Sequence, residues 1–343
     1  VADSDNYTLD REQKEFLKSE TFFGNEIVPA TYKTALMNLY LHNIGDLYGK
    51  VPVMRGDALL SDPGYRVDYV LTNPPFGKKS SITFTNEEEE QEEEDLVYNR
   101  QDFWTTSSNK QLNFIQHINT ILKPTGKAAV VVPDNVLFEG GAGEIIRKKL
   151  LDTTDLHTIL RLPTGIFYAQ GVKTNVLFFT KGTAANPQQT EGCTQQVWVY
   201  DLRTNMPSFG KRTPFGESHL TPFEAVYGES PLGNSQRSEG EWSFTAEGAE
   251  QTLENSRWRV FSREWIRESK GDSLDISWLK DNNSVDAANL PDPEILAAEA
   301  MSELTEALRE LDGLLNALGA GDEAESQKKL LAEVLGMGDE VKA

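Results

Sequence analysis

The chain has 343 residues, 38% of them hydrophobic, and a formal net charge of −21, which allows one large α/β domain with an appendage, or two domains. No run of about 18 apolar residues occurs, which excludes a membrane-spanning helix, and the first residues have neither the basic nor the apolar part of a signal peptide. A single cysteine, Cys193, excludes an internal disulfide framework and a thiolate metal cluster, so we expect a cytoplasmic protein.

The negative charge is concentrated in two segments. Residues 87–95 contain eight acidic residues and no basic one, and residues 291–343 contain thirteen acidic and four basic residues, which leaves −4 for the rest of the chain. Phosphate binding normally needs a basic surface. The composition therefore neither supports nor excludes a nucleic-acid partner, but it indicates that another protein would supply much of the contact with phosphate.

The first part of the chain predicts three short strands, each of which ends at a polar residue. Residues 9–19 are polar and fit a helix or a loop, whereas residues 29–42 begin with a proline and have apolar side chains at helical spacing. The strands are expected at residues 21–26, 51–59 and 66–72, and they place Glu26, Asp57 and Asn73 at or near their ends.

From residue 111 onward, helical and strand patterns alternate. Apolar positions predict helices over 111–122 and 142–151, and short apolar runs predict strands, the first of them fully buried, at 127–132, 156–161, 176–179 and 197–200. Strands that alternate with helices indicate an α/β fold with a doubly wound, mostly parallel sheet.

Three segments depart from this alternation. Residues 80–110 form a polar insertion around the first acidic run, and we expect the insertion to be flexible. Residues 203–290 show little periodicity, so we interpret 1–215 as the main domain and 216–290 as its irregular elaboration. Residues 291–343 form an acidic helical segment that either packs on its own domain or contacts a partner protein through a leucine stripe: Leu304, Leu308, Leu311, Leu315 and Leu318.

Residues 73–76 read Asn-Pro-Pro-Phe and follow the third predicted strand, whose apolar residues (Val67, Tyr69, Val70 and Leu71) predict burial. In open α/β sheets ligands bind at the carboxyl ends of strands, and the two prolines make this turn stiff. The Asn73 side-chain oxygen and the Pro74 carbonyl can together accept both hydrogens of one amino group, and Phe76 offers a flat face to a ring. The alternative is an ordinary strand followed by a proline turn.

Glu26, Asp57 and Asn73 follow one another at successive strand ends. A carboxylate after the second strand of such a sheet commonly binds the two hydroxyls of a ribose, and Glu26 fits that role. Asp57 can accept a hydrogen bond from an adenine amino group, and Asn73 would then face the reacting group. Each acid alone could be a turn or helix cap, but their order predicts a site for one nucleoside-shaped cofactor.

The tetrapeptide at Asn73 resembles the catalytic motif of the amino-methyltransferases, and its phenylalanine resembles the branch that modifies adenine N6 in DNA. Longer stretches within residues 20–215 resemble the modification subunit of type I restriction-modification systems. They include Phe-Gly-Asn-Glu-Ile-Val-Pro from Phe23, Gly-Asp-Ala-Leu from Gly56, Leu-Thr-Asn-Pro-Pro-Phe-Gly-Lys-Lys from Leu71, Leu-Phe-Glu-Gly-Gly-Ala-Gly from Leu137, Arg-Leu-Pro-Thr-Gly-Ile-Phe from Arg161 and Gly-Val-Lys-Thr-Asn-Val-Leu-Phe-Phe from Gly171.

This resemblance implies the Rossmann-like fold of the class I S-adenosylmethionine-dependent methyltransferases. It implies transfer of a methyl group from S-adenosylmethionine to the N6 amino group of an adenine that is flipped out of double-stranded DNA. It also implies assembly with a specificity subunit that reads the DNA, and with an endonuclease subunit in the complete system. The leucine-striped segment is where we expect contact with the specificity subunit.

The resemblance assigns catalysis to Asn73, Pro74, Pro75 and Phe76, and cofactor binding to Glu26, Asp57, Ala58 and Asn73. Phe76 would also stack on the flipped base. Phe167, followed by Tyr168, is a candidate for a second aromatic face on that base; its other interpretation is a core anchor. Lys78, Lys79 and Lys173 either contact the DNA backbone or are ordinary solvated lysines.

One departure from the family pattern affects activity. The family binds the methionine end of its cofactor with a Gly-rich loop after the first strand, and no such segment precedes Glu26. Gly140-Gly141-Ala142-Gly143 comes too late in the strand order to replace it. We expect that an N-terminal portion with this loop is missing, so that residues 1–343 alone bind the cofactor poorly and are inactive.

Two alternatives remain at this point. The Asn-Pro-Pro motif also occurs in enzymes that methylate a protein glutamine or an exocyclic amine of RNA, which more often have Tyr at the position of Phe76. The chain could instead be a non-catalytic subunit that keeps the fold for assembly. The missing Gly-rich loop favours that second alternative, whereas the presence of Glu26, Asp57 and Asn73 argues against it.

Overall fold

The computed structural model describes residues 9–46, 49–76, 81–85, 91–95, 98–167, 172–189, 192–211, 213–239, 255–281 and 301, with the backbone alone over 81–85 and 91–95. The chain divides into two compact units, residues 1–281 and 282–343, and every element below belongs to the first. The leucine-striped segment, Lys78, Lys79 and Tyr168 lie outside the described residues. Each helix within the described ranges is too short or too polar to cross a membrane.

The first elements form a small α/β unit. Helix α1 (Arg11–Ser19) begins at a capping box between Asp10 and Gln13, and α2 (Pro29–Leu41) begins at Pro29, which has no N–H to leave unpaired. Strands β1 (Gly24–Glu26) and β2 (Val53–Arg55) pair in parallel as a separate two-stranded sheet. The structure therefore confirms strands that lead to Glu26 and Asp57, and it assigns a helix to the first polar segment.

The main sheet has six strands among the described residues, in the order β10-β9-β7-β8-β6-β3. These strands are β3 (Val67–Thr72), β6 (Leu122–Pro133), β7 (Thr154–Leu162), β8 (Thr174–Lys181), β9 (Gln196–Asp201) and β10 (Trp258–Ser262). The α/β fold is confirmed, but the sheet is mixed: β3 is parallel to β6 and β7 to β9, whereas β8 is antiparallel to both neighbours and β10 to β9. Only residues 163–173 connect β7 to β8 in the sequence, and a parallel pair would need a crossover of about a dozen residues or more.

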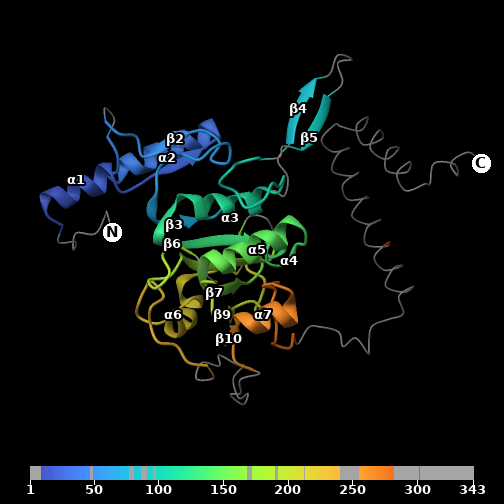
Figure 1. The fold of residues 1–343 in the computed structure, drawn as a ribbon. Helices are drawn as coiled ribbons and strands as arrows, with labels where there is room; N and C mark the ends of the chain where they lie inside the picture. Colours follow the sequence, from blue (N-terminus) through green and yellow to red (C-terminus); the bar gives the residue numbers. More distant parts are fainter. Residues whose placement is uncertain are drawn as a thin grey trace, which may run out of the picture. The chain divides into compact units, whose positions relative to one another are not determined.

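Helices cover both faces of this sheet (Figure 1). Helices α3 (Lys110–Ile121), α4 (Asp134–Phe138), α5 (Ala142–Thr153) and α7 (Arg263–Lys270) contribute to one apolar cluster together with Val197 and Val199 of β9. A 3₁₀ turn (Glu217–His219) and α6 (Thr221–Tyr227) lie near the other face, where α6 packs with Trp198 and Tyr200 of the same strand. The alternation along β9 shows that this strand is buried on both sides.

Two segments contain structure that the sequence pattern did not reveal. Within residues 203–290, where we expected irregular structure, β10 extends the main sheet and α7 packs on it. Within the insertion that we expected to be flexible, β4 (Ser81–Thr85) pairs antiparallel with β5 (Gln91–Asp95). Ile82, Thr83 and Phe84 favour a strand in spite of the acidic neighbours.

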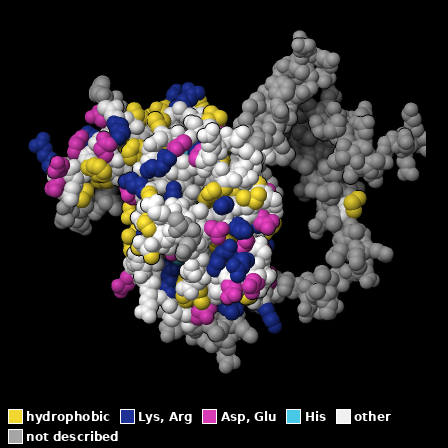
Figure 2. All heavy atoms as spheres, in the orientation of Figure 1, with side chains coloured by type: hydrophobic (Ala, Val, Ile, Leu, Met, Phe, Trp, Pro, Cys, Tyr) yellow, Lys and Arg dark blue, Asp and Glu magenta, His cyan; other side chains and the backbone are white. Residues whose placement is uncertain are grey.

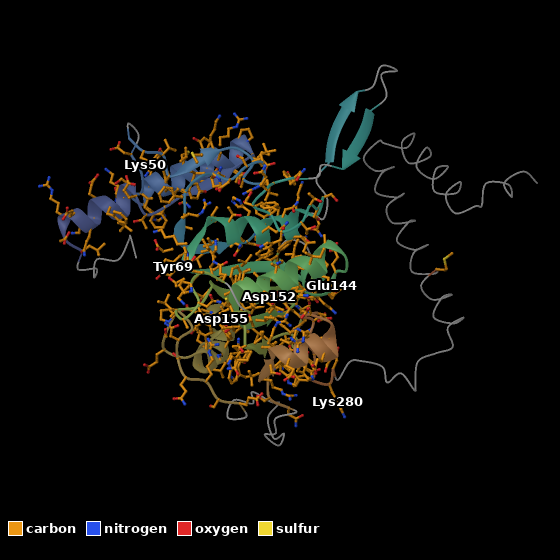
Figure 3. All side chains as sticks on the ribbon, viewed as in Figure 1. Lys50, Tyr69, Glu144, Asp152, Asp155 and Lys280 are labelled. Atoms are coloured by element: carbon orange, nitrogen blue, oxygen red, sulfur yellow. The ribbon has the colours of Figure 1, made fainter. Side chains whose placement is uncertain are left out.

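The prediction that β3 is a buried strand was wrong for one of its faces. Val70 is buried against α3, but Tyr69 is 59% exposed and Leu71 is 83% exposed. The reason is position: β3 is the last strand of the described sheet, and α6 covers the strands at the opposite end. Figure 3 labels Tyr69 at this margin, and Figure 2 shows further hydrophobic side chains over the N-terminal elements, where Met37 and Leu41 are exposed.

We expect Trp258→Ala to destabilise the fold by about 3–5 kcal/mol, because it would empty a large site in the core. Trp258 is fully buried and stacks on Trp198 with ring centroids 4.9 Å apart. Trp265→Ala is the matched control, since Trp265 is 36% exposed and its loss should cost about 1 kcal/mol or less. Urea denaturation of both variants measures the two free energies of unfolding; equal losses would contradict this assignment of the core.

Candidate functional site

The Asn73–Phe76 turn lies at the carboxyl end of β3, as the sequence predicts. Asn73 is exposed, Pro74 is buried and Phe76 is half-buried. The Phe76 carbonyl accepts a hydrogen bond of 2.7 Å from Nε2 of Gln111, in the first turn of α3. Because prolines cannot donate a backbone hydrogen bond, this side chain from a helix supplies a donor that fixes the end of the turn.

A chain of amide side chains lies behind Gln111. Its Oε1 accepts a hydrogen bond of 3.0 Å from Nδ2 of Asn135 in α4. Asn135 and Asn109 each donate to Oε2 of Glu139, also over 3.0 Å. Asn109 caps the start of α3 by accepting from the backbone N–H of Gln111. The turn is thereby tied to two helices, and no local pattern in the sequence indicated Gln111, Asn109 or Asn135.

Phe76 and Phe167 lie next to each other, although they are far apart in the sequence. Their ring centroids are 5.6 Å apart and their planes meet at 81°, an edge-to-face pair. Phe167 follows β7, whose carboxyl end lies at the same edge of the sheet as that of β3. The pair is not a parallel sandwich, and in this geometry Phe167 forms a wall beside Phe76.

Glu26 is the last residue of β1, and its carboxylate is oriented by the start of α2. Its Oε1 accepts a hydrogen bond of 2.7 Å from the backbone N–H of Val28, the residue before the helix. The Glu26 carbonyl accepts from the N–H of Gly56 over 3.1 Å. This contact holds Glu26 beside the loop that contains Asp57.

Both carboxylate oxygens of Asp57 accept hydrogen bonds from the protein. Oδ1 accepts from the backbone N–H of Leu59 over 2.8 Å, and Oδ2 accepts from the hydroxyl of Tyr98 over 2.9 Å. Arg100 donates to the Ala58 carbonyl over 3.3 Å. Each carboxylate oxygen can accept more than one hydrogen bond, so Asp57 is oriented and still able to accept from a ligand.

Arg100 is buried and is held by α3. It forms a salt bridge of 2.6 Å with Asp102, and its Nη1 lies 3.1 Å from Nδ1 of His117. Because a guanidinium can only donate, Nδ1 must accept, and the imidazole is neutral. Burial and the charge of Arg100 lower the pKa of His117 to about 4, so the ring stays uncharged at neutral pH. Tyr98, Arg100 and His117 are functional supports that the sequence analysis missed.

The structure thus joins the predicted site residues into two pairs. Glu26 lies beside the Asp57 loop, and Phe76 lies against Phe167; α3 connects the pairs, because Gln111 at its start contacts Phe76 and His117 in its middle contacts Arg100. Lys173 is exposed just before β8. Within the described ranges, no group of three or more acidic, His or Cys side chains could hold a metal ion.

Successive parts of the chain match two known protein families. Residues 5–258 match the N-6 DNA methylase family, and residues 290–333 match the C-terminal domain of type I restriction enzyme methylase subunits. The chain is 56% identical to the StySPI methylase subunit from Salmonella potsdam and to the EcoKI methylase subunit from Escherichia coli K12, over 96% of this chain and 62% of each relative. It therefore spans less than two thirds of the length of these curated relatives.

Solved structures agree with this likeness. The crystal structure of the type I restriction enzyme EcoKI M protein has a TM-score of 0.71 at 55% identity, over 95% of this chain and 66% of that one. A second solved structure, described as the structural basis of complex assembly and conformational transition of the type I R-M system, has a TM-score of 0.57 at 25% identity. The match covers 92% of this chain and 57% of that one. The resemblance seen in the sequence is confirmed: the chain belongs to the N-6 DNA methylase family, among the methylase subunits of type I restriction enzymes.

Proposed function

We propose that the chain is the catalytic part of a modification subunit that transfers a methyl group to the N6 amino group of adenine in DNA. The observation that carries this proposal is the Asn73–Phe76 turn at a strand end, fixed by Gln111 and faced by Phe167. A flipped purine needs acceptors for its amino group and an aromatic surface for its ring. Asn73, Pro74 and Phe76 supply these in four consecutive residues.

The residues at the other strand ends fit the adenosine half of S-adenosylmethionine. The Glu26 carboxylate suits the two ribose hydroxyls, and Asp57 with the small Ala58 suits the adenine amino group and ring edge. Both carboxylates are already oriented by backbone N–H groups, so they need little reorganisation on binding. When bound, this cofactor supplies the methyl group as an electrophile.

The chemistry of the chain's own residues is orientation. The Asn73 Oδ1 and the Pro74 carbonyl accept the two amino hydrogens of the target adenine, which keeps electron density on the nitrogen and aims its lone pair. Flipping the base costs a few kcal/mol, and stacking on Phe76 returns roughly 1–3 kcal/mol of that. Three lysines are candidate contacts to the DNA backbone: Lys78, Lys79 and Lys173.

We further propose that this cytoplasmic enzyme reads its DNA target through a specificity subunit and works beside an endonuclease subunit in the complete complex. Two observations support assembly: the match of residues 290–333 to a C-terminal domain of such methylases, and the likeness to a structure of a type I complex. The net charge of −21 is consistent with a partner chain that supplies much of the positive surface for DNA.

Asn73→Ala, in a complete subunit assembled with its specificity subunit, should lower methyl transfer at least about 100-fold, because a misoriented nucleophile loses that much. Binding of S-adenosylmethionine should change little. The test measures labelled methyl transfer to adenine and, separately, cofactor affinity. Transfer at the normal rate would contradict the proposed mechanism and leave the assembly role as the alternative.

Phe76→Ala should weaken productive capture of the base by roughly 5- to 150-fold, the equivalent of about 1–3 kcal/mol of lost stacking. Phe76→Tyr is the matched control, since it keeps the aromatic face. The fluorescence of 2-aminopurine at the target position reports capture, and transfer kinetics report its consequence. Equal behaviour of the two variants would rule out stacking as the role of Phe76.

Residues 1–343 alone should bind S-adenosylmethionine weakly, because they include Glu26 and Asp57 but no Gly-rich loop before them. Isothermal titration of this polypeptide, and of the same polypeptide preceded by a segment that contains the loop, compares the two affinities. Tight binding by residues 1–343 would show that the adenosine contacts suffice.

A further inference from the structure

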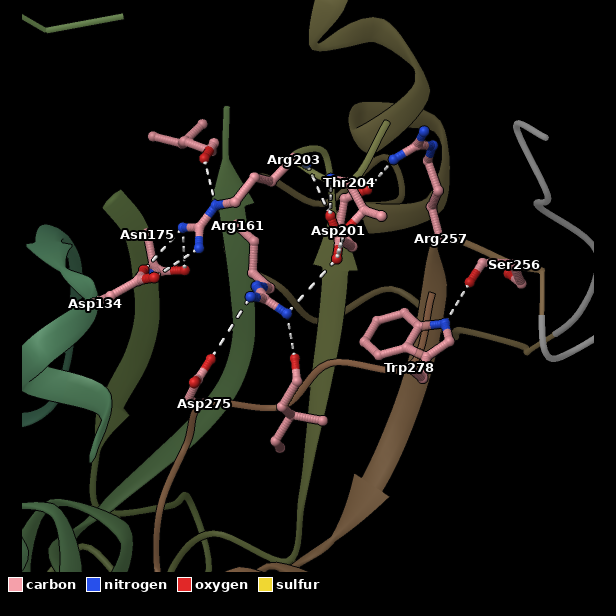
Figure 4. Close-up of polar contacts among 12 residues, drawn as sticks. Asp134, Arg161, Asn175, Asp201, Arg203, Thr204, Ser256, Arg257, Asp275 and Trp278 are labelled. Atoms are coloured by element: carbon pink, nitrogen blue, oxygen red, sulfur yellow. Dashed lines mark hydrogen bonds and ion pairs between the residues drawn. The ribbon is translucent and has the colours of Figure 1, made fainter. Parts of the chain in front are cut away.

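A cluster of charged and amide side chains lies at the same edge of the sheet as the Asn73–Phe76 turn. It consists of Asp134 after β6, Asn175 in β8 and Arg203 after β9, and we call it the Arg203 cluster (Figure 4). Arg203 Nη1 and Nη2 donate to the two carboxylate oxygens of Asp134 over 2.7 and 2.9 Å. Asn175 donates to Asp134 over 2.7 Å and accepts from Arg203 over 3.2 Å.

Arg203 also contacts the backbone on both sides of one loop. Its Nε donates to the carbonyl of Leu162, the last residue of β7, over 2.9 Å. Its Nη2 donates to the carbonyl of Thr174, the first residue of β8, over 2.7 Å. Residues 163–173 lie between them in the sequence, and the described part of this segment, 163–167 with 172 and 173, is a loop. One guanidinium thus closes the base of this loop, and a lysine, with a single nitrogen at its tip, could not reach the same set of acceptors.

The ion pair in the cluster is held firmly. The side chains of Arg203 and Asp134 are 10% and 20% exposed. Burial raises the pKa of Asp134, but the hydrogen bonds and charge of Arg203 outweigh it, so that the net pKa is lowered. The backbone N–H of Asp134 donates to the carbonyl of Lys173 over 2.9 Å. Asp134 therefore adds a third contact at the base of the loop.

A second segment, residues 206–209, contacts the loop between Thr164 and Phe167. The carbonyl of Thr164 accepts from the N–H of Phe209 over 2.9 Å. Gly165 has φ +82°, and a Cβ there would lie 1.9 Å from the carbonyl oxygen of Phe209, so only glycine allows this approach. Phe167 packs in the same apolar cluster as Met206. Residues 203–209 therefore support the loop from its base to Phe167.

We propose that Arg203 is a positioning residue for the target base. This role rests on the proposed function and requires no contact of Arg203 with the base or the cofactor. Arg203 fixes residues 163–167, which place Phe167 against Phe76. The two rings then form the aromatic wall of the base site. The cofactor residues Glu26 and Asp57 are supported by other contacts. Loss of the hydrogen bonds in the Arg203 cluster should therefore weaken capture of the DNA base and leave cofactor binding unchanged.

The test compares Arg203→Lys with Arg257→Lys in the complete modification subunit assembled with its specificity subunit. Arg257 is the matched control, because it immediately precedes β10 at the same edge of the sheet and donates to the carbonyl of Asp201, the last residue of β9, over 2.8 Å. We expect Arg203→Lys to raise the KM for DNA between about 10- and 100-fold, to lower the 2-aminopurine signal and to leave cofactor affinity unchanged. Arg257→Lys should change the KM for DNA, the 2-aminopurine signal and the cofactor affinity each by less than about twofold.

Hydrogen exchange gives a readout that does not depend on activity. The backbone amides that donate to the loop, that of residue 134 to the Lys173 carbonyl and that of Phe209 to the Thr164 carbonyl, should exchange faster in Arg203→Lys and, to a lesser degree, in Asp134→Asn. The amides of β6 and β9 should keep their protection. Faster exchange across β6 and β9 as well would assign Arg203 to the stability of the fold and overturn the proposal. So would a KM for DNA like that of Arg257→Lys. If the complex without any substitution transfers no methyl group to adenine, the proposed function fails, and the role of Arg203 in base capture fails with it.

Discussion

The hydrogen bond from Gln111 to the Phe76 carbonyl fixes the Asn73–Phe76 turn to the core. The two prolines stiffen the turn, but they also remove the N–H groups that could hydrogen-bond it to the rest of the fold. Helix α3 supplies the missing donor, and most of its residues are buried against the sheet. The position of the Phe76 carbonyl, at the end of the turn, is therefore set by the hydrophobic packing of a helix. The same helix holds Arg100 through His117, and so it also supports the Asp57 loop.

A common arrangement links the other parts of the site. Three parts of the site are each held by a polar side chain from elsewhere in the sequence: Asp57 by Tyr98, the Phe76 carbonyl by Gln111 and the base of the Phe167 loop by Arg203. Buried polar groups are costly unless all their hydrogen bonds are made. Arg203 avoids this cost, because it donates hydrogen bonds to a carboxylate, an amide and two backbone carbonyls. These bonds hold the ends of neighbouring strands together at one edge of the sheet.

The sequence predicted the parts of this molecule that depend on neighbours along the chain. Periodic apolar residues located α3 and α5, and polar residues at strand ends located Glu26, Asp57 and Asn73. What it could not predict depends on contacts across the fold. The direction of β8 follows from the small number of residues, 163–173, that separate it from β7, and β10 is too short to stand out from its surroundings. Gln111, Tyr98 and Arg203 act on residues 35 to 41 positions away, and single polar residues leave no periodic signal.

The margin of the sheet at β3 has a consequence for how the chain behaves in solution. In the described part of the chain, β3 pairs on one side only, with β6, and the side chain of Leu71 is 83% exposed. A free strand edge offers a row of unsatisfied backbone donors and acceptors to any other extended polypeptide. Such an edge, beside the side chains of Tyr69 and Leu71 that are exposed in the described part of the chain, favours edge-to-edge self-association and rising turbidity as the concentration increases. Handling this polypeptide at low concentration, or with a charged residue in place of Leu71, should keep it monodisperse.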